Sequence, residues 1–446
     1  MIITIICTLL LLYAISQYNK GKYACPFYIF VFFVSDAFIL NLGEPLLKYK
    51  DFSLLLLFSC SLIGLIRDSS FFKIKGTLGG KISVAFLFLF IFEFLYGCFA
   101  GVDTLSNIMA VVRGYLFVLA YFVFRKAPMD EINKSIRWIY MSVILSCMVF
   151  VVQYLTHIPL TRTFITESNI KTGNYRMQIT PPFIELSLLS LLFYLRKIRY
   201  RWVVVVLILG VLFISQNRTP LLGLFLSTGL FLLLDRKVKY KVQIMIAAIC
   251  IFPFVNSLLS SRSEASHETS SFDVPVWNYI SQGDFQGLAV QNTFMFRVAM
   301  IAERADYLIN NPANMLQGVG PMHEYTAQKK LHFIIGTATS DGRGYLVPSQ
   351  VESIDVAWVP ILIRYGLGGL AIHLTVILVM IVKFYRRRSN ATIMLGFLTY
   401  ITALAQSFSS GGMFFPLSIM TMMCFLIAYD RRIDLLYGNA ITYKKK

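Results

Sequence analysis

Apolar runs of about 16 to 25 residues recur along almost the whole chain, and they constrain its fold more than any other feature. A helical run of this length spans the hydrocarbon core of a bilayer. Hydrophobic residues make up 57% of the 446 residues, whereas charged residues make up only 14%. Because the backbone of a spanning segment must satisfy its polar groups without water, we expect these runs to be helices.

The sequence predicts an all-α polytopic membrane protein with about 12 or 13 transmembrane helices. The predicted spans are 2–17, 24–40, 52–66, 82–101, 107–124, 138–157, 182–195, 202–217, 220–235, 242–258, 357–383, 391–408 and 414–429. The first run lacks both a basic leading segment and a small-residue cleavage site, so it is expected to stay as a helix. The cysteines lie almost entirely inside these spans and offer neither a disulfide framework nor the spacing of a metal site.

The distribution of charge predicts the orientation of the helices. The net charge is +18, but the basic residues gather in short loops, which is the pattern of cytoplasmic loops and not of a nucleic-acid-binding face. These loops are 73–81, 125–137, 196–201, 236–241, 386–388 and 444–446. We therefore expect the C-terminus in the cytoplasm, no nucleic-acid partner, and an N-terminus on the outside if the number of spans is odd.

A polar stretch at 260–356 interrupts the apolar runs and divides the chain into three parts. An N-terminal transmembrane bundle covers 1–259, and C-terminal transmembrane helices with a basic cytoplasmic tail cover 357–446. The polar stretch holds six Lys or Arg against ten Asp or Glu, so by alternation it is predicted to be one large extracytoplasmic loop, partly helical. A protein that only moves solutes rarely needs such a loop, which favours chemistry at the membrane surface.

Charged residues within the predicted spans are candidates for function, because an unpaired charge in a bilayer costs a few kcal/mol or more. Arg113 lies about two turns into the fifth span, and Glu93 lies inside the fourth. The alternative to a functional role is a structural ion pair between these two residues.

Two further basic groups are predicted on the outer side. Arg218 lies in the hinge 215–220, which is so short that the flanking helices must form a tight hairpin. It is a candidate for substrate binding, and the alternative is an interfacial arginine that reaches lipid phosphate. The polar segment 158–182 carries Arg162, Lys171 and Arg176, which are also compatible with a solvated loop.

Within the long loop, the residues from Thr293 to Asn310 predict an amphipathic helix that follows Asn292 and ends before a proline. Arg297 and Arg304 lie on one face of it, about 10 Å apart along the axis. A guanidinium binds phosphate in a bidentate manner, so the pair suggests an oxyanion site. An ordinary exposed helix face would explain the spacing equally well.

Asp355 lies where the loop enters the next span, so its carboxylate is expected at the mouth of a helix beside the membrane. Partial burial there would suit a general base. A helix N-cap is the alternative, and the two roles are compatible. His323, in the same loop, is a second candidate for the base.

Taken in order, these residues resemble the O-antigen polymerase and O-antigen ligase superfamily. The matching residues are Ser215, Gln216, Asn217 and Arg218 in a tight turn, Arg297 ahead of Asn311 and Pro312, Gly318-Val319-Gly320-Pro321, Asp355, and then 364–370. The resemblance covers roughly Asn174 to Leu370. It implies a fold like that of glycosyltransferases of the GT-C type, which use polyprenyl-linked donors.

The resemblance also implies a function. Members of this family join polyprenyl-pyrophosphate-linked oligosaccharides outside the bacterial inner membrane, and outer-loop arginines hold the pyrophosphate. This assigns a catalytic role to Arg297 and Arg218 beside Asp355, and substrate binding to Arg176. From their positions in the sequence, Arg304, Arg113 and His323 are further candidates for substrate binding. Arg176 matches least well because the family's glycine-containing turn is missing after it. No cofactor and no metal are implied.

The resemblance favours a repeat-unit polymerase, because the ligases place a histidine where this chain has Asp355. The implied partners are the lipid-linked donor and acceptor glycans, the bilayer, a chain-length regulator and a flippase. One alternative is an O-antigen ligase that transfers glycan to a lipid A core. Another is a non-enzymatic polysaccharide transporter or flippase, which would not explain the long loop.

Overall fold

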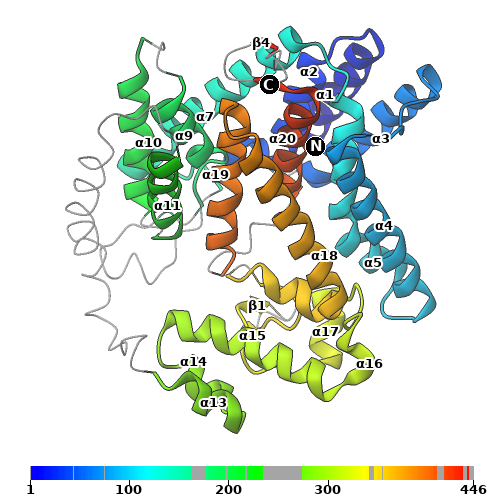
Figure 1. Ribbon diagram of the computed structural model, residues 1–446, viewed down its shortest axis with the longest axis vertical. Helices are drawn as coiled ribbons and strands as arrows, with labels where there is room; N and C mark the ends of the chain where they lie inside the picture. The colour runs from blue at the N-terminus through cyan, green and yellow to red at the C-terminus, as the bar shows by residue number, and fades with distance from the viewer. Residues whose placement is uncertain are drawn as a thin grey trace.

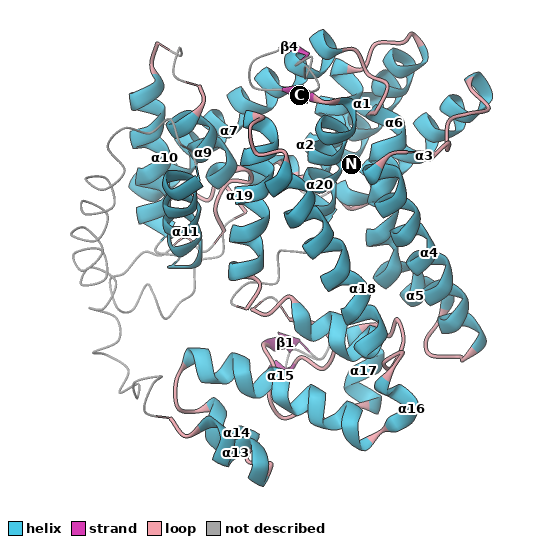
Figure 2. Ribbon diagram, in the orientation of Figure 1, coloured by secondary structure: helices cyan, strands magenta, loops and turns pink. Residues whose placement is uncertain are grey.

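The computed structural model describes residues 2–43, 45–74, 76–162, 177, 179–195, 199–215, 218–234, 274–340, 346–353, 355–408, 416–434 and 439–440. Helices dominate this part of the chain (Figures 1 and 2). Its strands form two short antiparallel pairs, β1 (Ala338–Ser340) with β2 (Leu346–Pro348) and β3 (Ile433–Asp434) with β4 (Asn439–Ala440).

Within the described residues, six helices are long and apolar enough to cross a membrane. They are α1 (Ile2–Asn19), α3 (Tyr49–Arg67), α4 (Leu78–Phe99), the continuous Leu105–Phe124 formed by α5 (Leu105–Val112), η2 (Arg113–Val118) and α6 (Leu119–Phe124), α7 (Met129–Thr156) and α18 (Trp358–Arg386). Six further helices beside them are shorter: α2 (Ala24–Val34), α9 (Ile184–Phe193), α10 (Arg201–Ser215), α11 (Arg218–Leu234), α19 (Ala391–Gln406) and α20 (Pro416–Arg431). The prediction of a helical membrane-embedded protein is confirmed.

Every predicted span except 242–258, which lies outside the described residues, falls on one of these helices. The predicted span 24–40 is wrong at its C-terminal end, because α2 stops at Val34. Four consecutive residues, Asp36 to Ile39, then have φ angles of 49°, 56°, 54° and 61°, which a right-handed helix does not allow. The apolar side chains there are buried, so hydrophobicity alone could not reveal the change of backbone direction.

Helix α18 is bent at Gly366, whose φ of 59° and ψ of −162° lie outside the helical region. The residues before the bend lie beside the polar layer, and those after it run up into the bundle (Figure 1). The bend frees the carbonyls of Ile363 and Arg364, which accept hydrogen bonds from the backbone N–H groups of Val319 and Gly320, both at 2.9 Å. The two glycine-rich motifs identified in the sequence thus meet through their backbones.

The contact is close enough to demand glycine on both sides. A Cβ atom on Gly318, which has a φ of +70°, would lie 2.4 Å from the carbonyl carbon of Arg364. A Cβ atom on Gly366 would lie 2.6 Å from the backbone nitrogen of Gly318. Any side chain at either position would therefore force the two backbones apart. We call this contact the glycine junction.

The described part of the long loop is a helical layer at one end of the bundle (Figure 1). It contains α13 (Val276–Gln282), α14 (Phe285–Ala289), α15 (Thr293–Asn310), α16 (Pro312–Met315), α17 (Glu324–Lys330) and the β1–β2 pair. The predicted helix is confirmed as α15 with the expected bounds. Its N-cap Asn292 accepts hydrogen bonds from Phe294 and Met295, and Asn311 follows its last residue.

The opposite end of the bundle carries the basic loops 125–137 and 386–388, which lie within the described residues. There Lys126 pairs with Asp68, Arg387 donates to the Tyr429 carbonyl at 3.0 Å, and Arg431 donates to the Ala127 carbonyl. Because α18 runs from the polar layer to Arg386, the basic turn that follows it lies at the far end from that layer (Figure 1). The two ends therefore differ in charge as the sequence indicated.

The glycine junction makes a sharp prediction about stability. We expect Gly318→Ala and Gly366→Ala each to lower the thermal midpoint of the detergent-solubilised protein by about 5 °C or more, because both clash with backbone and impose a positive φ on alanine. Gly114→Ala is the matched control, since no atom lies within 4 Å of the Cβ position at Gly114. Unchanged midpoints for both junction variants would contradict the close contact.

Candidate functional site

Several segments converge at the end of α19, on the side of the bundle that faces the polar layer. The Ser407 carbonyl accepts the backbone N–H of Ala357 at 2.9 Å, and its hydroxyl accepts the indole N–H of Trp358 at 2.7 Å. One residue earlier, Gln406 contacts α11, where a Cβ atom on Gly223 would lie 2.3 Å from its amide nitrogen. The start of α18 and the first turns of α11 are thus both fastened to this helix end.

Asp355 lies two residues before this attachment and is half-buried. It is not the N-cap of α18, because that helix begins at Trp358 with Ala357 as its cap residue. Instead, the Ser353 hydroxyl accepts the N–H groups of Asp355 and Val356, at 3.2 and 3.0 Å. The capping alternative is therefore wrong. Among the described residues, no hydrogen bond or ion pair engages the Asp355 carboxylate.

Arg297 lies one turn into α15, which packs against α18. Its side chain is half-buried, and its Nε atom is shielded from solvent with no hydrogen-bond partner. Trp358, the first residue of α18, follows the Asp355 segment closely, so the packing of α15 on α18 brings this helix near that segment. A shielded cationic group without a partner is costly, so it is a natural place for an anion to bind.

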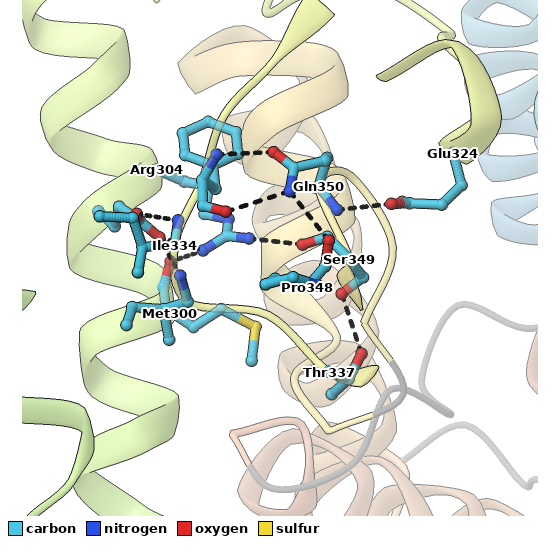
Figure 3. A network of polar contacts seen from close by, with 11 residues as sticks. Met300, Arg304, Glu324, Ile334, Thr337, Pro348, Ser349 and Gln350 are labelled. Carbon is cyan, nitrogen blue, oxygen red and sulfur yellow. Dashed lines mark hydrogen bonds and ion pairs between the residues drawn. The ribbon is translucent and has the colours of Figure 1, made fainter. Parts of the chain in front are cut away.

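Arg304 lies about two turns further along the same face of α15 as Arg297, but it has a different environment. Figure 3 shows the polar contacts around Arg304. It is fully buried, pairs with Glu303 at 2.6 Å, donates to the Ser349 carbonyl at 2.9 Å and stacks over the Phe333 ring at 4.4 Å. Burial lowers the pKa of Arg304 to about 10, against the opposing effect of Glu303 and Glu324, so the group stays a cation at neutral pH. Because Arg304 is fully buried and already paired with Glu303, its environment favours a structural role over the predicted role in substrate binding.

Buried carboxylates organise the rest of the layer. Glu324 accepts the backbone N–H groups of Gln350, Val351 and Glu352 at 2.6 to 3.0 Å, and Glu303 accepts those of Ile334 and Ile335. The Gln350 side chain in turn bonds both the N–H and the carbonyl of Phe333 and the Pro348 carbonyl, as Figure 3 shows in part. Glu324 and Glu303 therefore accept hydrogen bonds from backbone N–H groups, which gives them a structural role.

Arg364 ties the layer to the bent helix. Its Nε donates to the Met322 carbonyl at 3.0 Å, and its Nη2 contacts the Glu352 carboxylate at 3.2 Å. It therefore fixes the loop before His323 and the segment before Asp355 at the same time. In the sequence, Arg364 is visible only as the first residue of the motif 364–370. Its role as a link could not be predicted, because it depends on the bend at Gly366.

His323 is the N-cap of α17, and its Nδ1 accepts the N–H of Tyr325 at 3.3 Å. Its own backbone N–H donates to Asp103, in the turn between α4 and α5, at 3.0 Å. Asp103 also accepts from Thr104 and Asn107. Burial alone would raise the pKa of the Asp103 carboxyl, but hydrogen bonds from Asn107, His323 and Thr104 outweigh burial and hold this pKa below its usual range.

The remaining predicted residues are placed as follows. Arg113 pairs with Asp51 and not with Glu93, so the predicted Arg113–Glu93 ion pair is wrong. Glu93 is buried within α4, and its Oε2 has no partner among the described residues. Arg218 is the first residue of α11, but its side chain lies outside the described residues, as does the whole of Arg176.

Glu185, in the first turn of α9, was missed by the sequence analysis. Both of its carboxylate oxygens lie 3.2 Å from the amide nitrogen of Gln406, so Glu185 joins the segments that meet at the end of α19. A single acid in the first turn of an apolar helix is the signal that should have drawn attention to it. Glu185 is therefore a third candidate for the general base, beside Asp355 and His323.

No group of three or more His, Cys, Asp or Glu side chains suited to a metal ion occurs among the described residues. Comparison with known proteins finds no family model that matches the chain and no curated protein with significant sequence similarity. The function must therefore be argued from the site.

Asp103 provides a test of how the layer is held on the membrane helices. We expect Asp103→Asn to lower the thermal midpoint at pH 7, because hydrogen bonds to a charged acceptor are stronger than those to an amide. A carboxyl with a depressed folded pKa stabilises the fold above its unfolded pKa of about 3.9, and this contribution is lost as the pH falls through the folded value. The difference between wild type and variant should therefore narrow only below about pH 4. A difference in thermal midpoint between wild type and Asp103→Asn that is equal at every pH would refute the electrostatic explanation.

Proposed function

We propose that this protein is a membrane glycosyltransferase that polymerises polyprenyl-pyrophosphate-linked oligosaccharide repeat units into a surface polysaccharide. The observation that carries the proposal is the half-buried Arg297, whose shielded Nε has no hydrogen-bond partner among the described residues, on a helix that packs against α18, the helix that follows Asp355. A reaction that releases a pyrophosphate needs a cation at this position, and one that activates a sugar hydroxyl needs a base.

In this proposal, Arg297 stabilises the charge that develops on the departing polyprenyl pyrophosphate. The C–O bond between the donor sugar and the pyrophosphate breaks while the acceptor hydroxyl forms the new glycosidic bond. Arg218 begins α11 at the same end of the bundle and is the second candidate for the pyrophosphate. Arg304 is left out, because its charge is already neutralised by Glu303.

Asp355 is the proposed base that takes the proton from the acceptor hydroxyl. Its carboxylate is unengaged among the described residues, whereas those of Glu324 and Glu352 are bound to backbone N–H groups and to Arg364, respectively. Glu185 and His323 are the alternatives, since both lie on the same side of the bundle. The extended chain around Ser353 could adjust to a bound glycan more easily than a helix could.

The site is proposed to face the outside of a bacterial cytoplasmic membrane. The basic loops lie at the other end of the bundle, where the positive-inside rule places the cytoplasm. Lipid-linked repeat units that had already crossed the membrane would then reach the site from the outer leaflet.

The chemistry can be tested by measuring polymer in a strain that lacks the gene and carries a variant. We expect Asp355→Asn to reduce polymer by about a hundredfold or more, since it removes basicity while keeping size. Arg297→Ala should lose about a hundredfold, and Arg297→Lys less, because lysine keeps the charge without the bidentate fork. Single repeat units on the polyprenyl carrier should accumulate.

Arg388→Ala is a suitable control, because Arg388 is a half-exposed arginine of the basic end whose contacts are local, a hydrogen bond to the Tyr385 carbonyl and a cation–π contact with the Tyr385 ring. Normal polymer from both Asp355→Asn and Arg297→Ala, at normal protein levels, would remove this site from the mechanism. Long chains that remain on the polyprenyl lipid would indicate a ligase. Repeat units retained on the cytoplasmic side would indicate a transporter.

The orientation has its own test. A cysteine at Gln282, at the exposed end of α13, should react with a membrane-impermeant maleimide in intact cells or spheroplasts, whereas a cysteine at Lys20, at the exposed end of α1, should react only after lysis. The two sites lie at opposite ends of the bundle, so each controls for the other. The reverse pattern would place the proposed site in the cytoplasm and contradict the reaction.

A further inference from the structure

A cavity of about 740 Å³ opens between α2, α7, α9, α19 and α20. Its walls are mainly apolar. The lining includes Phe27, Ile136, Leu186, Leu395 and Phe425. This volume is in the range of pockets that hold a small molecule.

The cavity exists because small side chains face one another across these helices. They include Ser187, Ser190, Thr392, Thr421 and Cys424. Two of the serine hydroxyls in the wall are bonded to backbone: Ser190 donates to the Ser187 carbonyl at 2.8 Å, and Ser135 donates to the Ala24 carbonyl at 2.7 Å. The wall therefore offers an occupant apolar surface and little hydrogen bonding.

The dimensions and position of the cavity indicate one kind of occupant. Its lining follows α9 from Phe183 to Leu195, and this ten-residue helix is about 15 Å long. That length is about half of the 30 Å hydrocarbon core, which is the depth of one leaflet. A chain that enters at the basic end would run along α9 towards Phe183, which lies two residues before Glu185.

The basic end of the cavity is polar. Arg137 and Met141 line it and are exposed, so the cavity opens to the surface along α7. Arg137 and Asn133 also line an adjoining hollow of about 540 Å³ together with Lys134, Asp130 and Glu131.

The two cations lie three residues apart, on one face of α7. Of the two acids, Glu131 already accepts the backbone N–H groups of Tyr23 and Ala24, at 3.1 and 2.8 Å. The mouth of the cavity therefore has two exposed cations, Lys134 and Arg137, and one exposed acid, Asp130, so its net charge is positive. Trp138, next to Arg137, lies beneath Lys134 at 5.2 Å, as is usual for an aromatic side chain at a membrane interface.

We propose that this cavity binds one acyl chain of a phosphate-headed glycerolipid from the leaflet at the basic end, with the phosphate on Lys134 and Arg137. The charge at the mouth matches the phosphate, and the apolar walls match the chain. The phosphate contacts lie at the other end of the bundle from Asp355 and Arg297, and binding of the lipid does not require the proposed polymerase activity.

The test uses purified protein in detergent and palmitoyl-oleoyl phosphatidylglycerol as the probe. A lipid at about a hundredfold excess over its Kd should raise the thermal midpoint of the wild type by about 5 °C. Ser187→Phe and Thr421→Phe fill the cavity and should abolish this rise while leaving the lipid-free midpoint equal or higher. Met148→Phe, at an exposed site on α7, is the matched control and should keep the rise.

The headgroup contact is tested separately. Arg137→Gln should reduce the midpoint rise at a given lipid concentration, whereas Lys20→Gln, at the same end of the bundle, should not. Diacylglycerol with the same chains should give a much smaller rise than the phospholipid. Equal rises in wild type and both filled variants would overturn the cavity site. Equal rises with diacylglycerol and phospholipid would overturn the assignment of the phosphate.

Discussion

The glycine junction between the 318–320 turn and the bend of α18 is the contact on which the rest of the polar layer depends. A helix that bends inside a protein leaves carbonyls without their usual donors, and burying them unpaired costs free energy. Here the Val319 and Gly320 N–H groups satisfy the carbonyls of Ile363 and Arg364. The bend and the turn therefore stabilise each other. Because the turn belongs to the polar layer, their contact also holds this layer on α18.

The same junction fixes the site from two directions. Arg364, at the bend, binds the Met322 carbonyl and the Glu352 carboxylate, so the loops that lead to His323 and Asp355 share one anchor. At the other end of this segment, Ser407 holds Ala357 and Trp358. Asp355 lies between these attachments on irregular backbone. Its position is therefore fixed, while its carboxylate does not cap a helix and is left for other interactions.

The sequence predicted the helices well because apolar length is a local property. The bounds of α15 were predicted correctly because capping is also local: Asn292 precedes the first residue of the helix and Asn311 follows its last. What failed were the pairings across the chain. The partner of Arg113 proved to be Asp51, which lies 62 positions away, and the partners of Arg304 come from a strand and turn that no periodicity predicts. Both glycine motifs were visible, but nothing in either one showed that they contact each other.

The contrast between Arg297 and Arg304 shows what decides whether an arginine is available for binding. Both lie on one stripe of α15, so spacing treats them alike. Glu303 neutralises Arg304, which is fully buried against the Phe333 ring and the Ser349 carbonyl. Among the described residues, no acid pairs with Arg297, and its shielded Nε lacks an acceptor. An incoming anion would therefore gain most at Arg297, where it replaces a missing partner and does not compete with an existing one.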